Sequence, residues 1–350
     1  MANSEKIRQA LRQYSRKRPL YEALALRVSG ILKDLMDGRA VNYHSVSSRA
    51  KAVDSYEKKA SQEKYNDPEN EIMDMAGIRV ITYTQSEAEI VASLVKELFD
   101  IMSEYSVDKT EELGTDRVGY RSIHFVGTLG KARLKLPENQ VFEGMRFEIQ
   151  VRTILQHAWA EFEHDRNYKF AGVLPAKLKR RVSLLSGSLE SIDSEFDSIT
   201  HEMEDYTAAI KIKTESGDLE VPIDSTSLMA YLTRKFASLI QAGKLDPTLN
   251  NGDKDLVQAL HDMGIRTLKE LDSGIPSNFD TFEGKAAVDN FAGLLRNVMI
   301  ILDADRYFEK AWNKHWNLMG NESVELLEEF GIDMSSLAEK YHIVISPGFS

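Results

Sequence analysis

The chain has 350 residues, a net charge of −11 and no cysteine, which excludes disulfides and thiolate metal sites. Its length favours two domains, and its hydrophobic content of 42% is sufficient for buried cores. No long apolar run is present, and the first residues lack the apolar stretch of a signal peptide. We therefore expect a cytoplasmic protein that does not bind membranes.

The charge is distributed unevenly along the chain. Residues 1–200 hold 30 basic and 30 acidic residues, whereas residues 201–350 hold 14 and 25. An acidic C-terminal part can serve solubility alone. The alternative is an acidic domain that neighbours or covers a basic, phosphate-binding domain.

The first predicted elements are two helices of different character. Residues 4–37 have the apolar periodicity of an amphipathic helix. Residues 51–64 are helical in pattern but almost entirely polar. Lys51, Ser55 and Lys59 are spaced four residues apart, and Arg49 comes just before them. This basic stripe is either a solvated helix face or a set of side chains that binds phosphates.

The next predicted strand covers residues 78–83 and carries polar residues at its start. Asp74 lies just before the strand, Arg79 alternates with its apolar residues, and Gly77 allows a close approach of other groups to the backbone. An amphipathic helix over 86–102 and a strand over 123–129 follow. A Gly-Tyr-Arg-Ser turn at 119–122 leads into the latter.

Residues 147–169 predict a strand that leads directly into a helix. The strand alternates apolar residues with Glu148, Gln150 and Arg152, so one of its faces carries a carboxylate, an amide and a guanidinium group. The helix has a polar stripe of His157, Glu161 and His164. This spacing is not that of a zinc site, and it favours histidines that contact substrate or form structural hydrogen bonds.

Asp74 and Glu148 belong to neighbouring predicted strands surrounded by Arg and Lys. Mg²⁺ in proteins is usually held by one or two carboxylates together with substrate phosphates, so this pair suits Mg²⁺ and a polyphosphate. The chain has no GxxxxGK[ST] motif and is therefore not a P-loop enzyme.

Four segments in order resemble the synthetase domain of the RelA/SpoT alarmone synthetase family: RAKAVDSYEKK, DMAGIRV, GYRSIHFV and EIQVRTILQHAWAEFEH. The resemblance covers about residues 40–170. It implies an α+β fold with a nucleotidyltransferase-like mixed β-sheet flanked by helices. It also implies Mg²⁺ as cofactor and pyrophosphate transfer from ATP to a ribose 3′-hydroxyl, with release of AMP.

The resemblance also implies roles for individual residues. Asp74 and Glu148 match the two Mg²⁺-linked catalytic carboxylates, and Glu148 is the candidate base for the acceptor hydroxyl. Tyr120 matches the tyrosine that stacks on the acceptor base. The remaining matches are the donor ATP site (Arg49, Lys51, Ser55, Lys59 and Arg79, the last at the adenine) and the acceptor side (Arg121, His124, Gln150, Arg152 and His157).

Two departures from the family pattern leave the acceptor open. The segment before GYRS reads GTDRV, where many guanosine-specific members have a basic Asn-Pro-Lys type. His157 stands where many members have Asn or Asp. GDP or GTP is the first expectation. The alternatives are a toxic enzyme that modifies the 3′ end of tRNA, and a nucleotide sensor without catalysis, which the retention of both carboxylates disfavours.

A long helix is predicted after Pro175, and a mainly helical region follows it. Its apolar residues recur in steps of three and four (Val182, Leu185, Leu189, Ile192, Phe196, Ile199, Met203). This seam either packs on its own domain or joins copies in a homo-oligomer. We expect a pyrophosphokinase domain over 1–210 and an acidic, mainly helical accessory domain over 218–350. In the toxin alternative this second domain neutralises the first until a phage protein releases it.

Overall fold

The structure is a computed structural model that describes residues 2–108, 122–170, 175–247, 254–277, 279, 290–312 and 318–346. The chain forms two compact units, Met1–His201 and Glu202–Ser350. The predicted boundary between domains, at 210–218, lies C-terminal to this division and stays a prediction. Among the described residues, no helix is long and apolar enough to cross a membrane.

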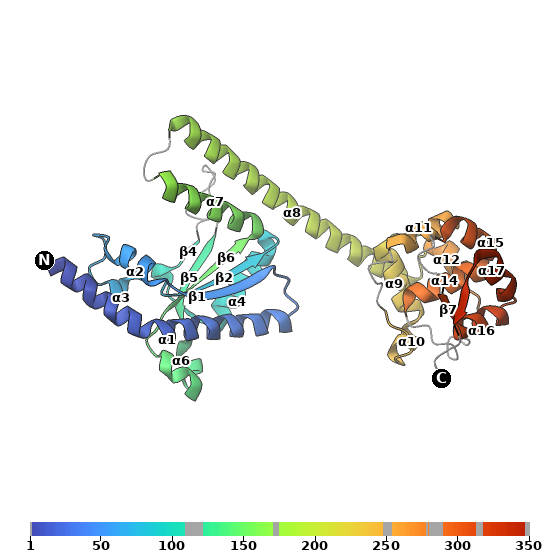
Figure 1. Ribbon diagram of the computed structural model, residues 1–350, viewed down its shortest axis with the longest axis horizontal. Coiled ribbons are helices and arrows are strands. Elements are labelled where there is room, and N and C mark those ends of the chain that lie inside the picture. The colour runs from blue at the N-terminus through green and yellow to red at the C-terminus, as the bar shows by residue number, and fades with distance from the viewer. Residues whose placement is uncertain are drawn as a thin grey trace. The chain divides into compact units, whose positions relative to one another are not determined.

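The first unit is built on a mixed sheet with helices on both sides (Figure 1). Its helices are α1 (Ala2–Gly38), α2 (Val53–Ala60), α3 (Pro68–Glu71), α4 (Gln85–Leu98), η1 (Ser103–Tyr105), α6 (Gly130–Leu134), η2 (Pro137–Phe142) and α7 (Ile154–Phe170). Its strands are β1 (Ser45–Ala50), β2 (Ala76–Thr82), β3 (Asp100–Ile101), β4 (Val107–Asp108), β5 (Ile123–Thr128) and β6 (Phe147–Thr153). This arrangement confirms the predicted α+β fold with a mixed sheet flanked by helices.

The sheet has the strand order β1-β2-β6-β5-β3, and β4 also pairs with β5. Strands β2 and β6 are parallel, whereas β1 pairs antiparallel with β2 and β5 pairs antiparallel with β6. The parallel pair is central and comes from the two predicted motif strands. The polar residues of both strands are therefore brought onto one side of the sheet.

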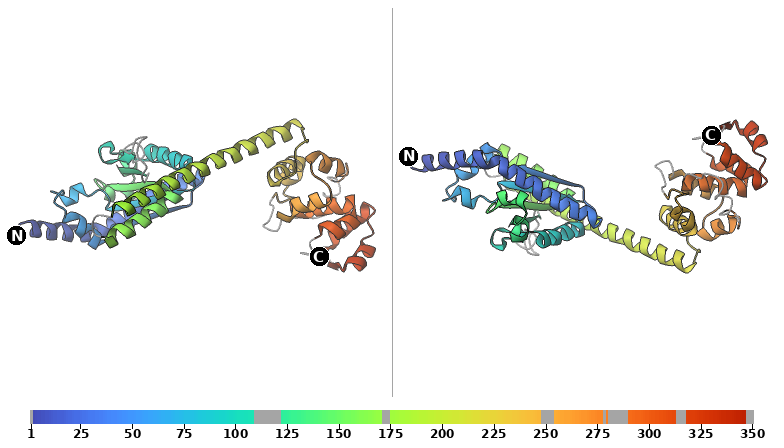
Figure 2. Two further views of the ribbon diagram at one scale, coloured as in Figure 1. Left: turned by 90° about the horizontal axis from the view of Figure 1, so that it is seen from above. Right: turned by 90° about the horizontal axis from the view of Figure 1, so that it is seen from below.

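The core lies on the other side of the sheet. Ile78, Val80, Ile149 and Val151 are almost fully buried there and pack with residues of α1 and α4. Helix α1 is a single helix that includes Pro19, and it runs along the sheet in both views of Figure 2. Since alternate strand residues point to opposite faces, burying this set leaves Gly77, Arg79, Glu148 and Gln150 for the open face.

Helix α8 (Ala176–Ser216) is a single helix of 41 residues. Two carboxylates attach it to the first unit. Asp193 accepts a hydrogen bond of 2.8 Å from the Thr153 hydroxyl, and Asp197 accepts bonds of 2.9 and 2.7 Å from the backbone N–H and hydroxyl of Ser86. Thr153 and Ser86 lie at the N-terminal ends of α7 and α4, where negative charge is favoured by the helix dipole.

The second unit is mainly helical, as expected. Its core includes Leu228, Phe236, Leu260, Leu295 and Leu327, each fully buried. Its elements after α8 are α9 (Ser225–Lys235), α10 (Ala237–Gln241), α11 (Lys254–Asp262), α12 (Leu268–Gly274), α14 (Phe291–Leu302), α15 (Ala304–Arg306), η3 (Tyr307–Ala311), β7 (Leu318–Gly320), α16 (Asn321–Glu329), α17 (Met334–Tyr341) and β8 (Val344–Ser346).

Candidate active site

The open face of the sheet carries a row of polar side chains that the strand register brings together. Gly77 on β2 lies opposite Glu148 on β6 and opposite Arg49 on β1. Arg79 lies opposite Gln150, and Gln150 lies opposite His124 on β5. Residues from four separate motifs therefore meet on one surface.

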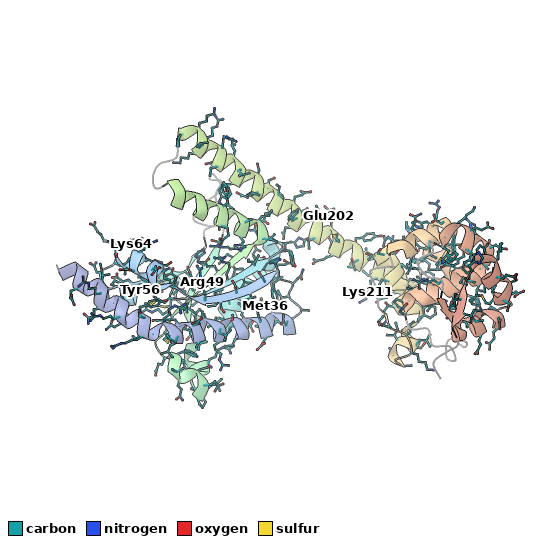
Figure 3. The ribbon with its side chains drawn as sticks, viewed as in Figure 1. Met36, Arg49, Tyr56, Lys64, Glu202 and Lys211 are labelled. Carbon is teal, nitrogen blue, oxygen red and sulfur yellow. The ribbon has the colours of Figure 1, made fainter. Side chains whose placement is uncertain are left out.

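A cavity of about 360 Å³ opens over this surface. Figure 3 marks Arg49, on β1, and Tyr56, on the neighbouring helix α2. The lining side chains are mostly polar and come from β1, the start of α2, β2 and β6: Ser47, Ser48, Arg49, Lys51, Ala52, Ser55, Asp74, Gly77, Ile78, Arg79, Glu148 and Gln150. The cavity thus joins the predicted phosphate-binding stripe to the two predicted carboxylates.

Asp74 is held between two ammonium groups. The Nζ atoms of Lys51 and Lys59 lie 2.6 and 3.0 Å from its two carboxylate oxygens. Burial alone would raise the pKa of Asp74, but the two lysines outweigh this effect and hold its pKa below the usual range. Asp74 is therefore ionised at neutral pH, and both lysines are placed beside the cavity.

Helix α1 fixes the backbone at Lys51. The Lys51 carbonyl oxygen accepts hydrogen bonds from the Tyr14 hydroxyl, at 2.6 Å, and from Nε of Arg18, at 3.3 Å. The Tyr14 ring is stacked on Tyr56 of α2, with 4.2 Å between ring centroids, and burial raises the pKa of Tyr14 to about 12. The sequence did not predict that Tyr14 and Arg18 bind the Lys51 backbone. Tyr14 is buried on α1, and the sequence pattern alone assigned it neither this position nor a partner for its hydroxyl.

Glu148 has a hydrogen-bond partner at each carboxylate oxygen. Nδ1 of His124 lies 3.0 Å from one oxygen, and the Gln150 amide donates to the other at 2.9 Å. Burial would raise the pKa of Glu148, yet these two partners outweigh it and lower the pKa below its usual value. Nε2 of His124 is buried and has no hydrogen-bond partner among the described residues, so it can serve a ligand.

Arg79 is oriented by helix α7. Its Nη1 lies 3.0 Å from the carboxylate of Glu161, and Nδ1 of His157 lies 3.8 Å from the same carboxylate oxygen. Burial, together with the positive charges of Arg79 and Arg152, lowers the pKa of His157, which outweighs the opposing charge of Glu161. Sequence reasoning placed Glu161 on the polar stripe but gave it no role.

The structure brings together most of the predicted site residues that it describes. Lys59 and His124 contact carboxylates that line the cavity, and Arg152 is buried at the end of β6 on the face of Glu148. His157 lies beside the pair of Arg79 and Glu161. Tyr120 and Arg121 fall outside the described residues, so their predicted contacts with the acceptor stay predictions.

The carboxylates suit a metal that relies on its substrate for further ligands. Among the described residues, no three His, Asp or Glu side chains gather closely enough to hold a metal ion. Asp74 and Glu148 instead offer oxygen ligands within one cavity, as Mg²⁺ prefers when phosphate oxygens and water complete its shell. The residues present therefore fit Mg²⁺ bound together with a nucleotide.

Known proteins match the part of the chain that contains this site. Residues 48–172 match the family model described as the region found in RelA / SpoT proteins. GTP pyrophosphokinase YjbM of Bacillus subtilis is 31% identical over 176 residues, which cover 49% of this chain and 79% of YjbM. GTP pyrophosphokinase YwaC, from the same organism, is 31% identical over 110 residues, or 31% of this chain and 48% of YwaC.

Among solved structures, small alarmone synthetase 1 of Bacillus subtilis is similar over 55% of this chain and 98% of its own length. The sequence identity is 24% and the TM-score is 0.45. The matched sequence region, residues 48–172, contains every residue that lines the cavity except Ser47. From the extent of the match with YjbM and the family model, the chain belongs to the RelA/SpoT family.

Proposed function

We propose that this protein transfers pyrophosphate from ATP to the 3′-hydroxyl of GDP or GTP, which yields a (p)ppGpp-type alarmone and AMP. One observation carries the proposal. Asp74 and Glu148 line a single cavity together with Arg49, Lys51 and Ser55, so two anionic groups lie beside cationic and hydroxyl side chains of the types that bind phosphates. Phosphoryl-type transfer depends mainly on such positioning and charge neutralisation.

The acceptor is inferred from the relatives. Both Bacillus subtilis proteins are named GTP pyrophosphokinases, which supports a guanosine nucleotide as first choice. The segment GTDRV and His157 differ from the pattern of many guanosine-specific members. The experiment must therefore distinguish tRNA from a guanosine nucleotide as the acceptor. Neutralisation by the C-terminal domain and its release by a phage protein stay predictions from the sequence.

In the proposed reaction, the acceptor 3′-oxygen attacks the β-phosphorus of ATP. The bond between that phosphorus and the oxygen that bridges to the α-phosphate breaks, and AMP leaves with the bridging oxygen. Glu148 accepts the proton of the 3′-hydroxyl. Its low pKa keeps it ionised before the reaction, and His124 and Gln150 fix the orientation of its carboxylate.

On the donor side, the resting partners of Asp74 must be exchanged when ATP binds. Lys51 and Lys59 neutralise Asp74 in the nucleotide-free site, and their ammonium groups turn to the ATP phosphates on binding. Asp74 and Glu148 are the residues that would hold Mg²⁺, which neutralises phosphate charge when bound. Arg79 contacts the adenine in this arrangement, held in place by Glu161.

The test is to incubate the full-length chain with Mg²⁺ and ATP labelled at the γ-phosphate, plus GDP, GTP or deacylated tRNA. We expect the label to move to the guanosine nucleotides. Glu148→Gln should reduce the rate by at least about a hundredfold, as loss of a general base does. Glu195→Gln, at an exposed position of α8, is the control. Label found on tRNA alone would show that tRNA, and not a guanosine nucleotide, is the acceptor. No transfer to any acceptor would overturn the proposal.

A further inference from the structure

Helix α8 exposes an apolar stripe along its length. Leu185, Ile192 and Ile199 are spaced seven residues apart and are 48%, 44% and 46% exposed, and Phe196 is 44% exposed. Val182 and Leu189 complete the pattern and are partly buried. We call these six residues the α8 stripe: Val182, Leu185, Leu189, Ile192, Phe196 and Ile199. They occupy the a and d positions of a coiled coil.

A different face of α8 packs on the first unit. Ser186 and Asp193 are buried, Asp193 binds Thr153, and Asp197 binds Ser86. The helix is therefore already attached through a polar face. The predicted alternative, in which the seam itself packs on its own domain, does not account for the exposed members of the stripe.

The charges on α8 show what the stripe fits. Four exposed cations lie at its N-terminal end, at Lys177, Lys179, Arg180 and Arg181, and none forms an ion pair with a residue that the structure describes. They oppose the helix dipole, which favours negative charge at this end. Further along, exposed charges include Glu195, Glu202 and Glu204, and Figure 3 marks Glu202 on this helix.

We propose that α8 pairs with α8 of a second copy of this chain, in antiparallel orientation. A parallel copy would place the two basic ends together, whereas an antiparallel copy places each basic end beside the partner's acidic segment. The pairing that aligns a with d positions joins Val182 to the partner's Ile199, Leu185 to the partner's Phe196, and Leu189 to the partner's Ile192. Arg181 then lies beside the partner's Glu202.

Cysteine cross-linking tests the orientation directly, because the chain has no cysteine of its own. Two full-length chains with tags of different size carry Leu185→Cys and Phe196→Cys, respectively, and a mild oxidant is added to each alone and to the mixture. We expect a cross-linked species only in the mixture. Cross-linking of each chain with itself would show that the pair is parallel. If no sample contained a cross-linked species, the helices would not pair. Either result overturns the proposal.

Sedimentation of the full-length chain tests the surface itself. Leu184 and Leu185 are adjacent and exposed, at 63% and 48%, but only Leu185 belongs to the α8 stripe. Leu185→Glu should weaken the dimer by at least about tenfold, whereas Leu184→Glu should leave it unchanged. Circular dichroism checks that both variants are folded. A monomeric wild-type chain at about 100 µM, or equal effects of the two substitutions, would contradict the proposal.

Discussion

Gly77 lies directly opposite Glu148 across the parallel pair of β2 and β6, and opposite Arg49 across the antiparallel pair of β1 and β2. It is the one position in this row of three without a side chain. A Cβ atom added there would contact only the Arg49 carbonyl oxygen, at 3.8 Å, which is an ordinary van der Waals distance. The protein therefore accommodates an alanine at position 77, but its methyl group would take up space beside Glu148.

Gly77→Ala should separate stability from activity. Alanine removes backbone entropy from the unfolded chain, so we expect the free energy of unfolding to change by less than about 1 kcal/mol. The rate of pyrophosphate transfer should fall, and it should fall further in Gly77→Val as more of the cavity floor is filled. Urea denaturation and the labelled-transfer assay measure the two effects. An active Gly77→Val variant would show that substrate does not occupy this space.

Lys59→Met removes one of the two cations that neutralise Asp74. Because a charged hydrogen bond contributes about 1.5–3 kcal/mol, we expect the KM for ATP to rise by about tenfold or more. The pKa of Asp74 should also rise toward its usual value, since Lys59 is one of the two groups that lower it. Steady-state kinetics and carboxyl NMR measure these quantities. Lys135→Met is the control, because Lys135 is exposed and lies between α6 and η2. It should change neither the KM for ATP nor the pKa of Asp74.

The strands and helices around the site could be predicted because each has a simple period. Alternation placed Glu148, Gln150 and Arg152 on one face of β6, as the structure has them. Spacing by four placed Lys51, Ser55 and Lys59 on one helix; the helix is shorter, Val53–Ala60, and Lys51, just before it, meets Lys59 at Asp74. Sheet order was a different matter. The sequence placed Asp74 and Glu148 on neighbouring strands, but the parallel pairing of β2 with β6 and the register that sets Gly77 opposite Glu148 join residues 71 positions apart, which local patterns do not encode.

The missed residues share one physical property, which is that their role depends on a distant partner. Tyr14 and Arg18 act on the backbone carbonyl of Lys51, and Glu161 acts on Arg79. A side chain that binds a backbone atom leaves no complementary side chain in the sequence to reveal it. The start of α7 follows a local rule instead, since threonine is a common helix cap and the Thr153 hydroxyl accepts from the N–H of Gln156, three residues on, at 3.2 Å.

Glu161→Gln should weaken ATP binding with little effect on the chemical step. Glu161 contacts Arg79 at 3.0 Å and does not line the cavity, so it acts by positioning. Since the Glu161 side chain is 59% exposed and exposed ion pairs contribute about 0.2–1 kcal/mol, the KM for ATP should rise only about two- to fivefold while kcat is kept. Adding Arg79→Lys to Glu161→Gln should not bring the KM for ATP back to the wild-type value. A fall in kcat at unchanged KM would contradict a positioning role.

The titration of His157 should report the charge of Arg79. Burial and the positive charge of Arg79 hold the pKa of His157 below 6.5, so Arg79→Met should raise it, and NMR titration of the ring measures the change. In the wild type the unfolded chain binds this proton more readily than the folded chain. Stability is therefore lost as the pH falls from about 6.5 toward the folded pKa. His157→Gln should lose less stability between pH 7.5 and pH 5.5, and equal losses would show that another group titrates.

The attachment of α8 should depend on Asp193 more than on its exposed neighbours. The Asp193 carboxylate is buried and accepts from Thr153, the last residue of β6, just before α7 begins. Asp193→Ala leaves the Thr153 hydroxyl without this acceptor, and a buried polar group that loses its partner costs about 1–3 kcal/mol. Glu195→Ala, two residues further on the exposed side, should change the free energy of unfolding by less than about 0.5 kcal/mol. Urea denaturation of the full-length variants compares them, and equal values would mean that the contact with Thr153 does not hold α8 on the sheet domain.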